Sequence, residues 1–308
     1  MSHKTYTIAL DAMGGDHAPA QTVEGAILAA QETSDLILLV GDKDELEAEL
    51  QKYPANYPNI RIVPSEGVIN EGEHPVRALR DKPKSSIATA IGLLKEAKAD
   101  SVVSMGSTGA TMAAAVLLLG VFNGLERPTL GGPFISLAPS TSIIDLGAQI
   151  DCRPTQLLSF AALGTTYTRL FQGISNPRVA LLSVGSEAGK GNRQVQESYP
   201  LFQQSGLNFV GNIEGHELLM GKAEVVVCDG FVGNILLKYT EGLAEAAARH
   251  MAAERGDDDP SVRAIRSLAE AAEKAGGPLL GINGVVMVGH GRAPARSVAN
   301  AIQTSTEF

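Results

Sequence analysis

The sequence contains only two cysteines, Cys152 and Cys228, among its 308 residues. Two cysteines cannot form a disulfide framework, so the sequence favours a reduced setting in the cytoplasm. The longest apolar run, around residues 112–121, is shorter than the roughly 20 residues of a membrane-spanning helix. The N-terminus shows no basic-then-apolar signal segment. We therefore expect a cytoplasmic protein.

An excess of positive charge is also missing. The chain has 25 Lys and Arg against 34 Asp and Glu, a net charge of −9, which argues against a general nucleic-acid binder. Several catalytic signatures are absent as well: a Gly-x-Ser-x-Gly elbow, zinc-type Cys/His spacing, a P-loop and a complete Rossmann fingerprint. The sequence therefore predicts no metal site and no cofactor.

The apolar residues that are present form short β-rich runs, which alternate with helical patterns along the chain. Strands are predicted at 7–10, 36–40, 61–63, 101–104, 134–137, 142–145, 179–183, 208–210, 224–228 and 285–288. Helices are predicted from about Pro19 and at 85–99, 108–119, 155–171, 192–204, 233–254 and 294–303. This alternation is typical of an α/β protein with a three-layer, mostly parallel sheet. We expect a single domain over 1–308 with a helical hairpin at about 240–276, in which Asp259 caps the second helix and Pro260 opens it.

The first candidate site follows the first strand, where Asp11, Asp16 and His17 surround a Gly14-Gly15 pair. Ligands of α/β proteins bind where a strand leads into a helix, and glycines let the backbone come close to them. The alternative is an ordinary strand-to-helix turn in which Asp16 or His17 lies near the helix cap.

A second candidate lies at Gly106, Ser107, Thr108 and Gly109, again between a strand and a helix. Two glycines, two hydroxyls and a helix N-terminus suit an anion such as phosphate. A glycine-permitted turn with a Ser or Thr cap explains the same residues equally well.

Two further strand ends carry polar side chains. Asp145 follows one strand, and Asp229 with Asn234 follows another, so all three are candidates for substrate binding. Cys152 is interpreted as a small buried side chain because no basic partner lies near it in the sequence. Phe231 is interpreted as a core residue.

Lys190 lies between two glycines after a predicted strand, at the start of a helix next to Asn192. A lysine there can reach an oxyanion, while a solvated loop lysine is the alternative. Asn192 is a further candidate for substrate binding. His290, also between two glycines, is a candidate accessible imidazole.

Residues 74–86 concentrate the cations Arg77, Arg80, Lys82 and Lys84 in an otherwise acidic chain. Such a patch can attract an acidic substrate or partner, with Arg80 and Lys82 as the main candidates. An ordinary solvated surface is the alternative, above all for Lys84.

Six motifs occur in order between Ile8 and Ile302. They are Asp-Ala-Met-Gly-Gly-Asp-His-Ala-Pro at 11–19, Ser-Met-Gly-Ser-Thr-Gly-Ala at 104–110, Asp-Leu-Gly-Ala-Gln-Ile-Asp-Cys at 145–152, Lys-Gly-Asn at 190–192, Val-Val-Cys-Asp-Gly-Phe-Val-Gly-Asn at 226–234 and Leu-Leu-Gly-Ile-Asn-Gly-Val-Val at 279–286. Together they resemble the bacterial phosphate acyltransferases of the PlsX type.

The resemblance implies a fold similar to phosphotransacetylases and the isocitrate-dehydrogenase-like group. It implies transfer of a fatty acyl group from acyl carrier protein to inorganic phosphate, giving acyl phosphate for phospholipid synthesis. A homodimer is expected, and the membrane glycerol-phosphate acyltransferase that acts downstream is a further possible partner. In this interpretation Asp11, Asp16 and His17 orient a donor or move a proton, and Lys190 stabilises an oxyanion. An enzyme using a small acyl-CoA, or a non-catalytic binding paralogue, remains the alternative.

The chain departs from the family pattern in four places. Ser107 replaces a usual Asn, Glu187 is the only acid at 185–190, and Arg292-Ala293 replaces small hydroxyl residues. The hairpin at 243–276 is shorter and more polar than usual, and its tip at 256–260 carries three adjacent carboxylates. An anionic leaflet repels such a tip, so we expect weak membrane association at most. The apolar positions Val262, Ile265 and Leu268 are predicted to pack against the partner helix or a second subunit.

Overall fold

The computed structural model describes residues 4–133, 138, 140–273 and 277–308. The chain divides into two compact units. Unit 1 comprises Met1–Phe122 and Glu273–Phe308, and unit 2 comprises Asn123–Ala272. Within the described residues, no helix has both the length and the apolar character that crossing a membrane requires.

Unit 1 is built on a six-stranded sheet with the strand order β3-β2-β1-β4-β11-β10. The first five of these strands are parallel, and β10 runs antiparallel to β11. The strands are β1 (Thr7–Asp11), β2 (Leu36–Gly41), β3 (Ile60–Pro64), β4 (Ser101–Ser104), β10 (Gly277–Leu280) and β11 (Val285–Val288). The helices are α1 (Ala20–Glu32), α2 (Lys43–Leu50), α3 (Pro75–Asp81), α4 (Ser86–Lys95), α5 (Thr108–Leu118) and α10 (Ala295–Thr304).

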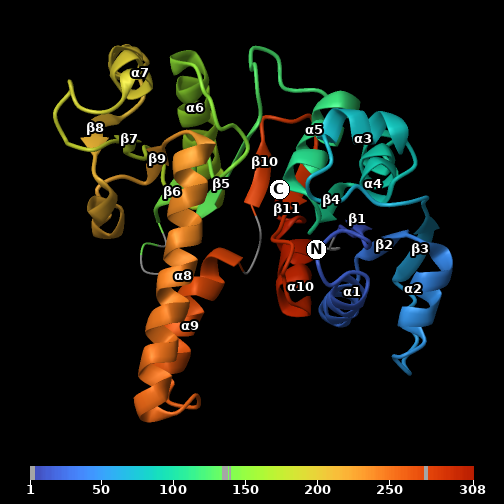
Figure 1. Cartoon of the computed structure of the whole chain (residues 1–308). Helices are drawn as coiled ribbons and strands as arrows, with labels where there is room; N and C mark the ends of the chain where they lie inside the picture. The colour runs from blue at the N-terminus through green and yellow to red at the C-terminus, as the bar shows by residue number, and fades with distance from the viewer. Residues whose placement is uncertain (1–3, 134–137, 139, 274–276) are drawn as a thin grey trace. The chain divides into compact units, whose positions relative to one another are not determined.

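Helices cover both faces of this sheet, as Figure 1 shows. Successive residues of a strand point to opposite faces, so Ile8 and Leu10 enter the core beneath α1 and α10, while Ala9 enters the core beneath α4 and α5. This double burial is why the strands appear in the sequence as short continuous apolar runs.

Unit 2 has a five-stranded sheet with the order β5-β6-β9-β7-β8. β6, β9, β7 and β8 are parallel, and β5 runs antiparallel to β6. The strands are β5 (Thr129–Pro133), β6 (Ser142–Ile144), β7 (Val179–Leu182), β8 (Phe209–Ile213) and β9 (Val225–Val227). The helices are α6 (Pro154–Phe171), α7 (Arg193–Gln204), the 3-10 helix η1 (Gly215–Met220), α8 (Gly230–Arg255) and α9 (Pro260–Glu273).

In unit 2, α6 lies against one face of the sheet and the start of α8 against the other. Gly164 brings α6 close to the strands, because a Cβ there would lie 2.7 Å from Val225 and 2.8 Å from Ile144. On the opposite face, Ile143 and Val226 pack in one cluster with Leu236 of α8. Both units therefore have the layered, mostly parallel α/β architecture that the sequence predicts.

The predicted helical hairpin is formed by α8 and α9, which lie side by side in Figure 1. Asp259 caps α9, since its Oδ1 accepts hydrogen bonds from the backbone N–H and the hydroxyl of Ser261, as predicted. Val262 of α9 and Ala248 of α8 are fully buried, and Ile265 is half-buried. The side chain of Leu268 lies outside the described residues.

The sequence-based assignment of elements needs several corrections. The predicted strand at 134–137 lies outside the described residues, and β5 precedes it at Thr129–Pro133. β10, α2, α3 and η1 were not predicted. Phe231 is 59% exposed on the first turn of α8, so its interpretation as a core residue is wrong.

Candidate functional site

In unit 1, the strand order reverses direction between β1 and β4. The chain runs outward from β1 to β2 and β3, and then returns to place β4 on the other side of β1. Open α/β sheets bind ligands at the carboxyl ends of strands at such a switch point. β1 ends at Asp11 and β4 ends at Ser104, and these two residues are paired in the strand register.

Asp11 is buried at this point, and Ser104 Oγ donates a hydrogen bond of 2.7 Å to its Oδ2. Among the described residues, Asp11 Oδ1 accepts no hydrogen bond. Burial raises the pKa of the Asp11 carboxyl, while the hydroxyls of Ser86 and Ser104 act in the opposite direction. Asp11 is therefore placed to hold two loops together rather than to contact bulk solvent.

The loops after β1 and β4 approach each other through glycine. A Cβ on Gly14 would lie 2.6 Å from Asp11 Oδ2 and 2.8 Å from Gly106 N, so no larger residue fits there. Gly106 N donates to Ser104 Oγ at 3.1 Å. The predicted residues Asp11 and Gly106 are thus in one cluster.

The rest of the predicted anion loop forms the N-terminus of α5. Ser107 is the cap, and its Oγ accepts a hydrogen bond of 3.4 Å from Ala110 N. Thr108 is the first residue of the helix, and the residues from Gly106 to Gly109 are half-buried. Capping and anion binding remain compatible here, because a helix N-terminus has more N–H groups than one cap satisfies.

The loop after β11 lies against the loop after β1. Asp16 N donates to Gly291 O at 2.7 Å, and Arg292 Nε lies 3.6 Å from Asp16 Oδ2. The backbone N–H of Arg292 also donates to His290 Nδ1 at 3.4 Å. The predicted residues Asp16, His17 and His290 therefore belong to one edge of the sheet, and Asp16 and His17 are exposed.

Arg292 is a residue of this edge that sequence reasoning did not select. The sequence marked it only as a departure from the family pattern. Its side chain is 81% exposed, and its guanidinium adjoins the carboxylate of Asp16. The signal was its position two residues after His290, directly beyond a strand end.

The predicted basic patch is largely neutralised by neighbouring acids. Lys82 Nζ is 2.8 Å from Glu73 and also donates to the carbonyl of Val68. Arg77 lies 3.6 Å from Asp81, and Lys84 lies 2.9 Å from Glu66. Of the four predicted cations, Arg80 alone has no carboxylate within 4 Å in the described part of the chain, and it is exposed.

In unit 2, the carboxyl ends of three adjacent parallel strands, β6, β9 and β7, carry the predicted polar residues. Asp145 follows β6, Asp229 follows β9, and Lys190 and Asn192 lie between β7 and α7. Since parallel strands end at the same edge of a sheet, these segments meet there.

Asp145 is completely buried, and its carboxylate accepts four backbone hydrogen bonds. Oδ1 accepts from Leu130, Gly147 and Ala148 at 3.3, 3.0 and 2.9 Å, and Oδ2 accepts from Gln149 at 2.8 Å. Burial raises the pKa of Asp145 to about 6, although these N–H groups lower it. In this geometry Asp145 shapes the loop that follows it.

The start of α8 packs tightly against that loop. A Cβ on Gly233 would lie 1.8 Å from the carbonyl oxygen of Asp145, and Gly230 N donates to Gln149 O at 2.7 Å. Asp229 caps α8 through a 2.9 Å hydrogen bond from Val232 N to its Oδ1. The exposed Asn234 lies beside Gly147, so the structure groups it with Asp145 and Asp229.

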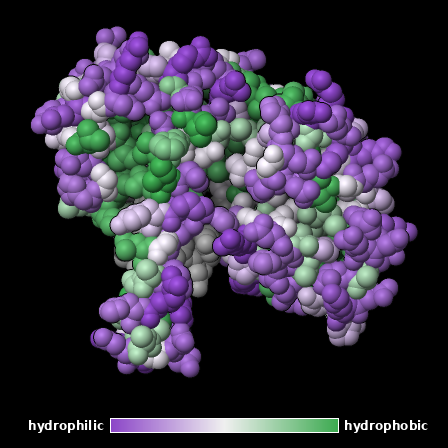
Figure 2. Space-filling model, in the orientation of Figure 1, coloured by the Kyte–Doolittle hydropathy of each residue, from purple (hydrophilic) through white to green (hydrophobic). Residues whose placement is uncertain are grey.

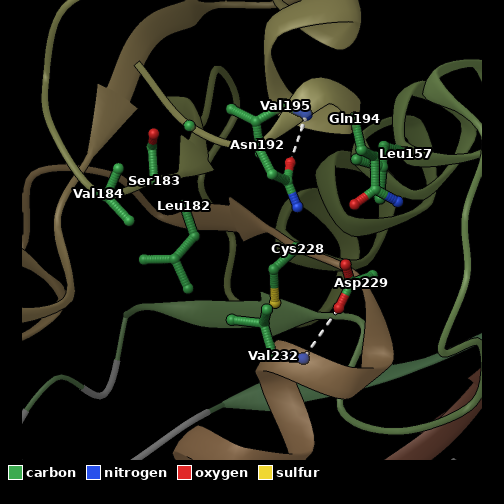
Figure 3. A pocket seen from close by; sticks show the side chains of 11 residues that line it. Leu157, Leu182, Ser183, Val184, Asn192, Gln194, Val195, Cys228, Asp229 and Val232 are labelled. Atoms are coloured by element: carbon green, nitrogen blue, oxygen red, sulfur yellow. Dashed lines mark hydrogen bonds between the residues drawn. The ribbon is translucent and has the colours of Figure 1, made fainter.

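Asn192 caps α7, as its Oδ1 accepts from Val195 N at 3.0 Å (Figure 3). Its oxygen is therefore occupied, while its amide nitrogen points toward Cys228. Lys190 is exposed in the preceding loop, two residues before the Asn192 cap and three before the first residue of α7. This is the strand-to-helix turn at which the sequence placed it.

The surroundings of both cysteines disfavour the thiolate form. Cys228 is buried, and burial holds the pKa of its thiol well above the usual value. Burial and the nearby Asp145 raise the pKa of Cys152 to about 12. Across the described ranges, no three His, Cys, Asp or Glu side chains gather in a way that could hold a metal ion.

Comparison with known proteins gives the family. A profile of the fatty acid synthesis protein family matches residues 6–308. The chain belongs to this family. A phosphate acyltransferase from Acaryochloris marina is 44% identical over 97% of this chain and 91% of its own length. Another from Dictyoglomus turgidum is 42% identical over 98% of this chain and 93% of its own length. Because these phosphate acyltransferases match the chain over nearly its whole length, the chain is an acyltransferase.

Solved structures share the fold. A phosphotransacetylase from Streptococcus pyogenes has a TM-score of 0.66 at 16% identity, covering 98% of this chain and 94% of its own. A 4-hydroxythreonine-4-phosphate dehydrogenase from Klebsiella pneumoniae has a TM-score of 0.57 at 14% identity, covering 99% of this chain and 98% of its own. The predicted similarity of fold to the phosphotransacetylases is confirmed.

Proposed function

We propose that this acyltransferase moves a fatty acyl group from acyl carrier protein to inorganic phosphate, and that the acyl phosphate formed feeds phospholipid synthesis. The match to phosphate acyltransferases along nearly the whole chain carries this proposal. The glycine-rich strand ends of both units support it, because they leave backbone N–H groups near candidate ligand positions.

The chemistry asks little of a protein nucleophile. A phosphate oxygen attacks the thioester carbonyl carbon, the carbon–sulfur bond breaks, and sulfur leaves as a thiolate. Phosphate is largely dianionic near neutral pH, by analogy with the second pKa of about 6 in phosphoesters. A thiol with a pKa of about 8.5 departs without protonation. The enzyme must therefore hold phosphate against the carbonyl and stabilise the oxyanion.

Taking each unit by itself, we assign binding of an anion such as phosphate to the loop from Gly106 to Gly109 in unit 1, and stabilisation of an oxyanion to Lys190 in unit 2. The half-buried N-terminus of α5 supports the first assignment. The exposed ammonium of Lys190 supports the second, since the described residues hold no carboxylate within 4 Å of it. Asp16 and His17 remain candidates for orienting the donor or moving a proton.

We propose that acyl carrier protein docks near Arg80. Acyl carrier proteins are acidic, and Arg80 is exposed and free of a carboxylate partner in the described structure. Lys82 contributes less than predicted, because Glu73 already balances its charge.

We further propose that the protein is a homodimer, with the hairpin near its interface. Phe231, Ile235, Tyr239 and Leu243 recur every four residues on α8 and are exposed by 59%, 51%, 67% and 56%. Figure 2 shows apolar surface gathered over unit 2 where α8 begins. A second copy would bury this surface, as exposed apolar patches of this kind often mark interfaces.

A cytoplasmic location with weak membrane association completes the proposal. The hairpin tip is exposed except at Asp259, and it has no large apolar side chain. Any contact with the downstream membrane glycerol-phosphate acyltransferase would then rest on protein surfaces and not on this tip.

The donor is tested by incubating the protein with phosphate and either acyl carrier protein loaded with a long-chain acyl group or acetyl-CoA. We expect acyl phosphate from the first donor and little from the second. Preference for acetyl-CoA would assign the protein to the small-donor alternative. Absence of phosphate-dependent thioester loss with both donors would support the non-catalytic alternative.

A further inference from the structure

Unit 2 contains a pocket of about 180 Å³ at the carboxyl ends of β7 and β9, between the first turns of α7 and α8 (Figure 3). An apolar cavity of about 150 Å³ is large enough to hold benzene. The pocket therefore has room for a segment of about six carbon atoms. Its apolar walls are formed by Leu157, Leu182, Val184, Val195, Cys228 and Val232.

Most polar side chains that line the pocket already have partners. Asn192 and Asp229 each accept the hydrogen bond that caps a helix, and Gln194 Nε2 donates to Cys152 O at 2.6 Å. The Cys228 thiol is neutral because burial raises its pKa far above its usual value. The described residues that line the pocket include no Lys, Arg or His, so the pocket is poorly suited to phosphate.

Ser183 differs from these side chains, because its buried hydroxyl makes no hydrogen bond in the described part of the chain. A buried hydroxyl without a partner is unfavourable, and a ligand with an acceptor atom at this position would remove that penalty. The pocket thus suits a ligand that combines a hydrocarbon segment with one uncharged acceptor, such as a carbonyl oxygen.

We propose that this pocket binds the first carbons of the donor's acyl chain, with Ser183 Oγ donating a hydrogen bond to the thioester carbonyl oxygen. This inference deepens the proposed function, because it names the part of the substrate that unit 2 recognises. The apolar walls of the pocket supply affinity for the acyl chain, and Ser183 fixes the position of the thioester carbonyl. Ser183 is a substrate-positioning residue in this account.

The test uses 2-oxoalkylphosphonates, stable analogues of acyl phosphate, with chains of two to sixteen carbons. Binding to the full chain is measured by calorimetry. In the wild type, affinity rises about fourfold for each of the first few methylenes, as expected for burial of hydrocarbon. Val195→Phe fills the pocket, so in this variant the affinity no longer increases with the length of the alkyl chain. Val210→Phe, at a 45% exposed valine of β8 that does not line the pocket, keeps it.

Ser183→Ala gives an independent readout. Because Ser183 Oγ has no partner in the free protein, the variant keeps wild-type stability. It weakens binding of a 2-oxoalkylphosphonate about tenfold but leaves an alkylphosphonate without the oxo group unchanged, since one hydrogen bond to a neutral group is lost. An equal effect on both probes would overturn the role of Ser183.

Two results would overturn assignment of the pocket to the acyl chain. The first is a wild type whose affinity does not depend on chain length, or a dependence that Val195→Phe leaves intact. The second is a Val195→Phe variant that binds the phosphonates normally but holo acyl carrier protein weakly, which would assign the pocket to the pantetheine arm. A wild-type protein that binds the 2-oxoalkylphosphonates yet makes no acyl phosphate would contradict the proposed function but not the assignment of the pocket.

Discussion

Replacing Gly233 with alanine should disrupt the contact between α8 and the loop after β6. The added Cβ would lie 1.8 Å from the carbonyl oxygen of Asp145 and 3.3 Å from Cys228 Sγ. A backbone carbonyl cannot swing away as a flexible side chain can, so α8 must move by about 1 Å or more. That movement displaces Asp229, whose carboxylate caps the helix, and Asn234 beside it.

The expected magnitude follows from the geometry and from a matched control. Overpacking a tight site lowers the unfolding free energy by about 1–3 kcal/mol and occasionally more. Because the added Cβ would meet a backbone atom, we expect Gly233→Ala to lower it by about 3 kcal/mol or more. Gly242 lies on the same helix with nothing within 4 Å of an added Cβ. Gly242→Ala should therefore raise the unfolding free energy by about 0.5–1 kcal/mol through helix propensity alone.

Urea unfolding followed by circular dichroism measures both variants. The account predicts changes of opposite sign, with a difference of about 4 kcal/mol between them. If Gly233→Ala unfolds within about 0.5 kcal/mol of the wild type, the close approach of α8 to Asp145 is wrong.

Further predictions concern single residues at the two sheet edges and the hairpin. Because burial raises the pKa of Asp145 from 3.8 to about 6, the folded state binds its proton more tightly than the unfolded chain does. Relative to Asp145→Asn, the wild type should therefore lose up to about 3 kcal/mol of unfolding free energy as the pH rises from about 4 through 6. A difference between the two proteins that does not change with pH would refute this. Lys190→Ala should lower kcat/KM by roughly 100-fold, equivalent to about 3 kcal/mol, without changing the midpoint of unfolding. If the control Lys222→Ala loses as much activity, Lys190 has no specific role in stabilising the oxyanion. Arg80→Glu should raise the KM for acyl carrier protein donors but not that for phosphate, an effect that added salt should mimic; an unchanged KM would move the docking surface elsewhere. Little protein should sediment with anionic liposomes, and salt-resistant pelleting would show that the tip at 256–260 does not keep the hairpin off the membrane.

Much of the local structure follows from patterns that act over a few residues. Alternating burial of Ile8, Ala9 and Leu10 comes from the two-residue period of a strand between two helical layers. The caps formed by Ser107 and Asp259 come from short polar side chains just before helical runs. Such signals depend on neighbours in the sequence, so they were predictable.

What could not be predicted depends on contacts between distant segments. The sequence shows a carboxylate at Asp145, but its complete burial under four N–H groups is set by how β6, β5 and the following loop fold together. Glu73 neutralises Lys82 from nine residues away, which turns an apparent basic cluster into paired charges. Phe231 looks like a core residue by composition, and only its position on α8 places it outside.

Phosphate-dependent formation of acyl phosphate tests the central claim most directly. Purified protein is mixed with acyl carrier protein that carries a long acyl chain, with and without radiolabelled inorganic phosphate, and the released thiol and the labelled acyl phosphate are measured separately. The account predicts one acyl phosphate for each thiol released, and neither product without phosphate or enzyme. Thioester loss that yields free fatty acid, or no loss at all in folded protein, would contradict it.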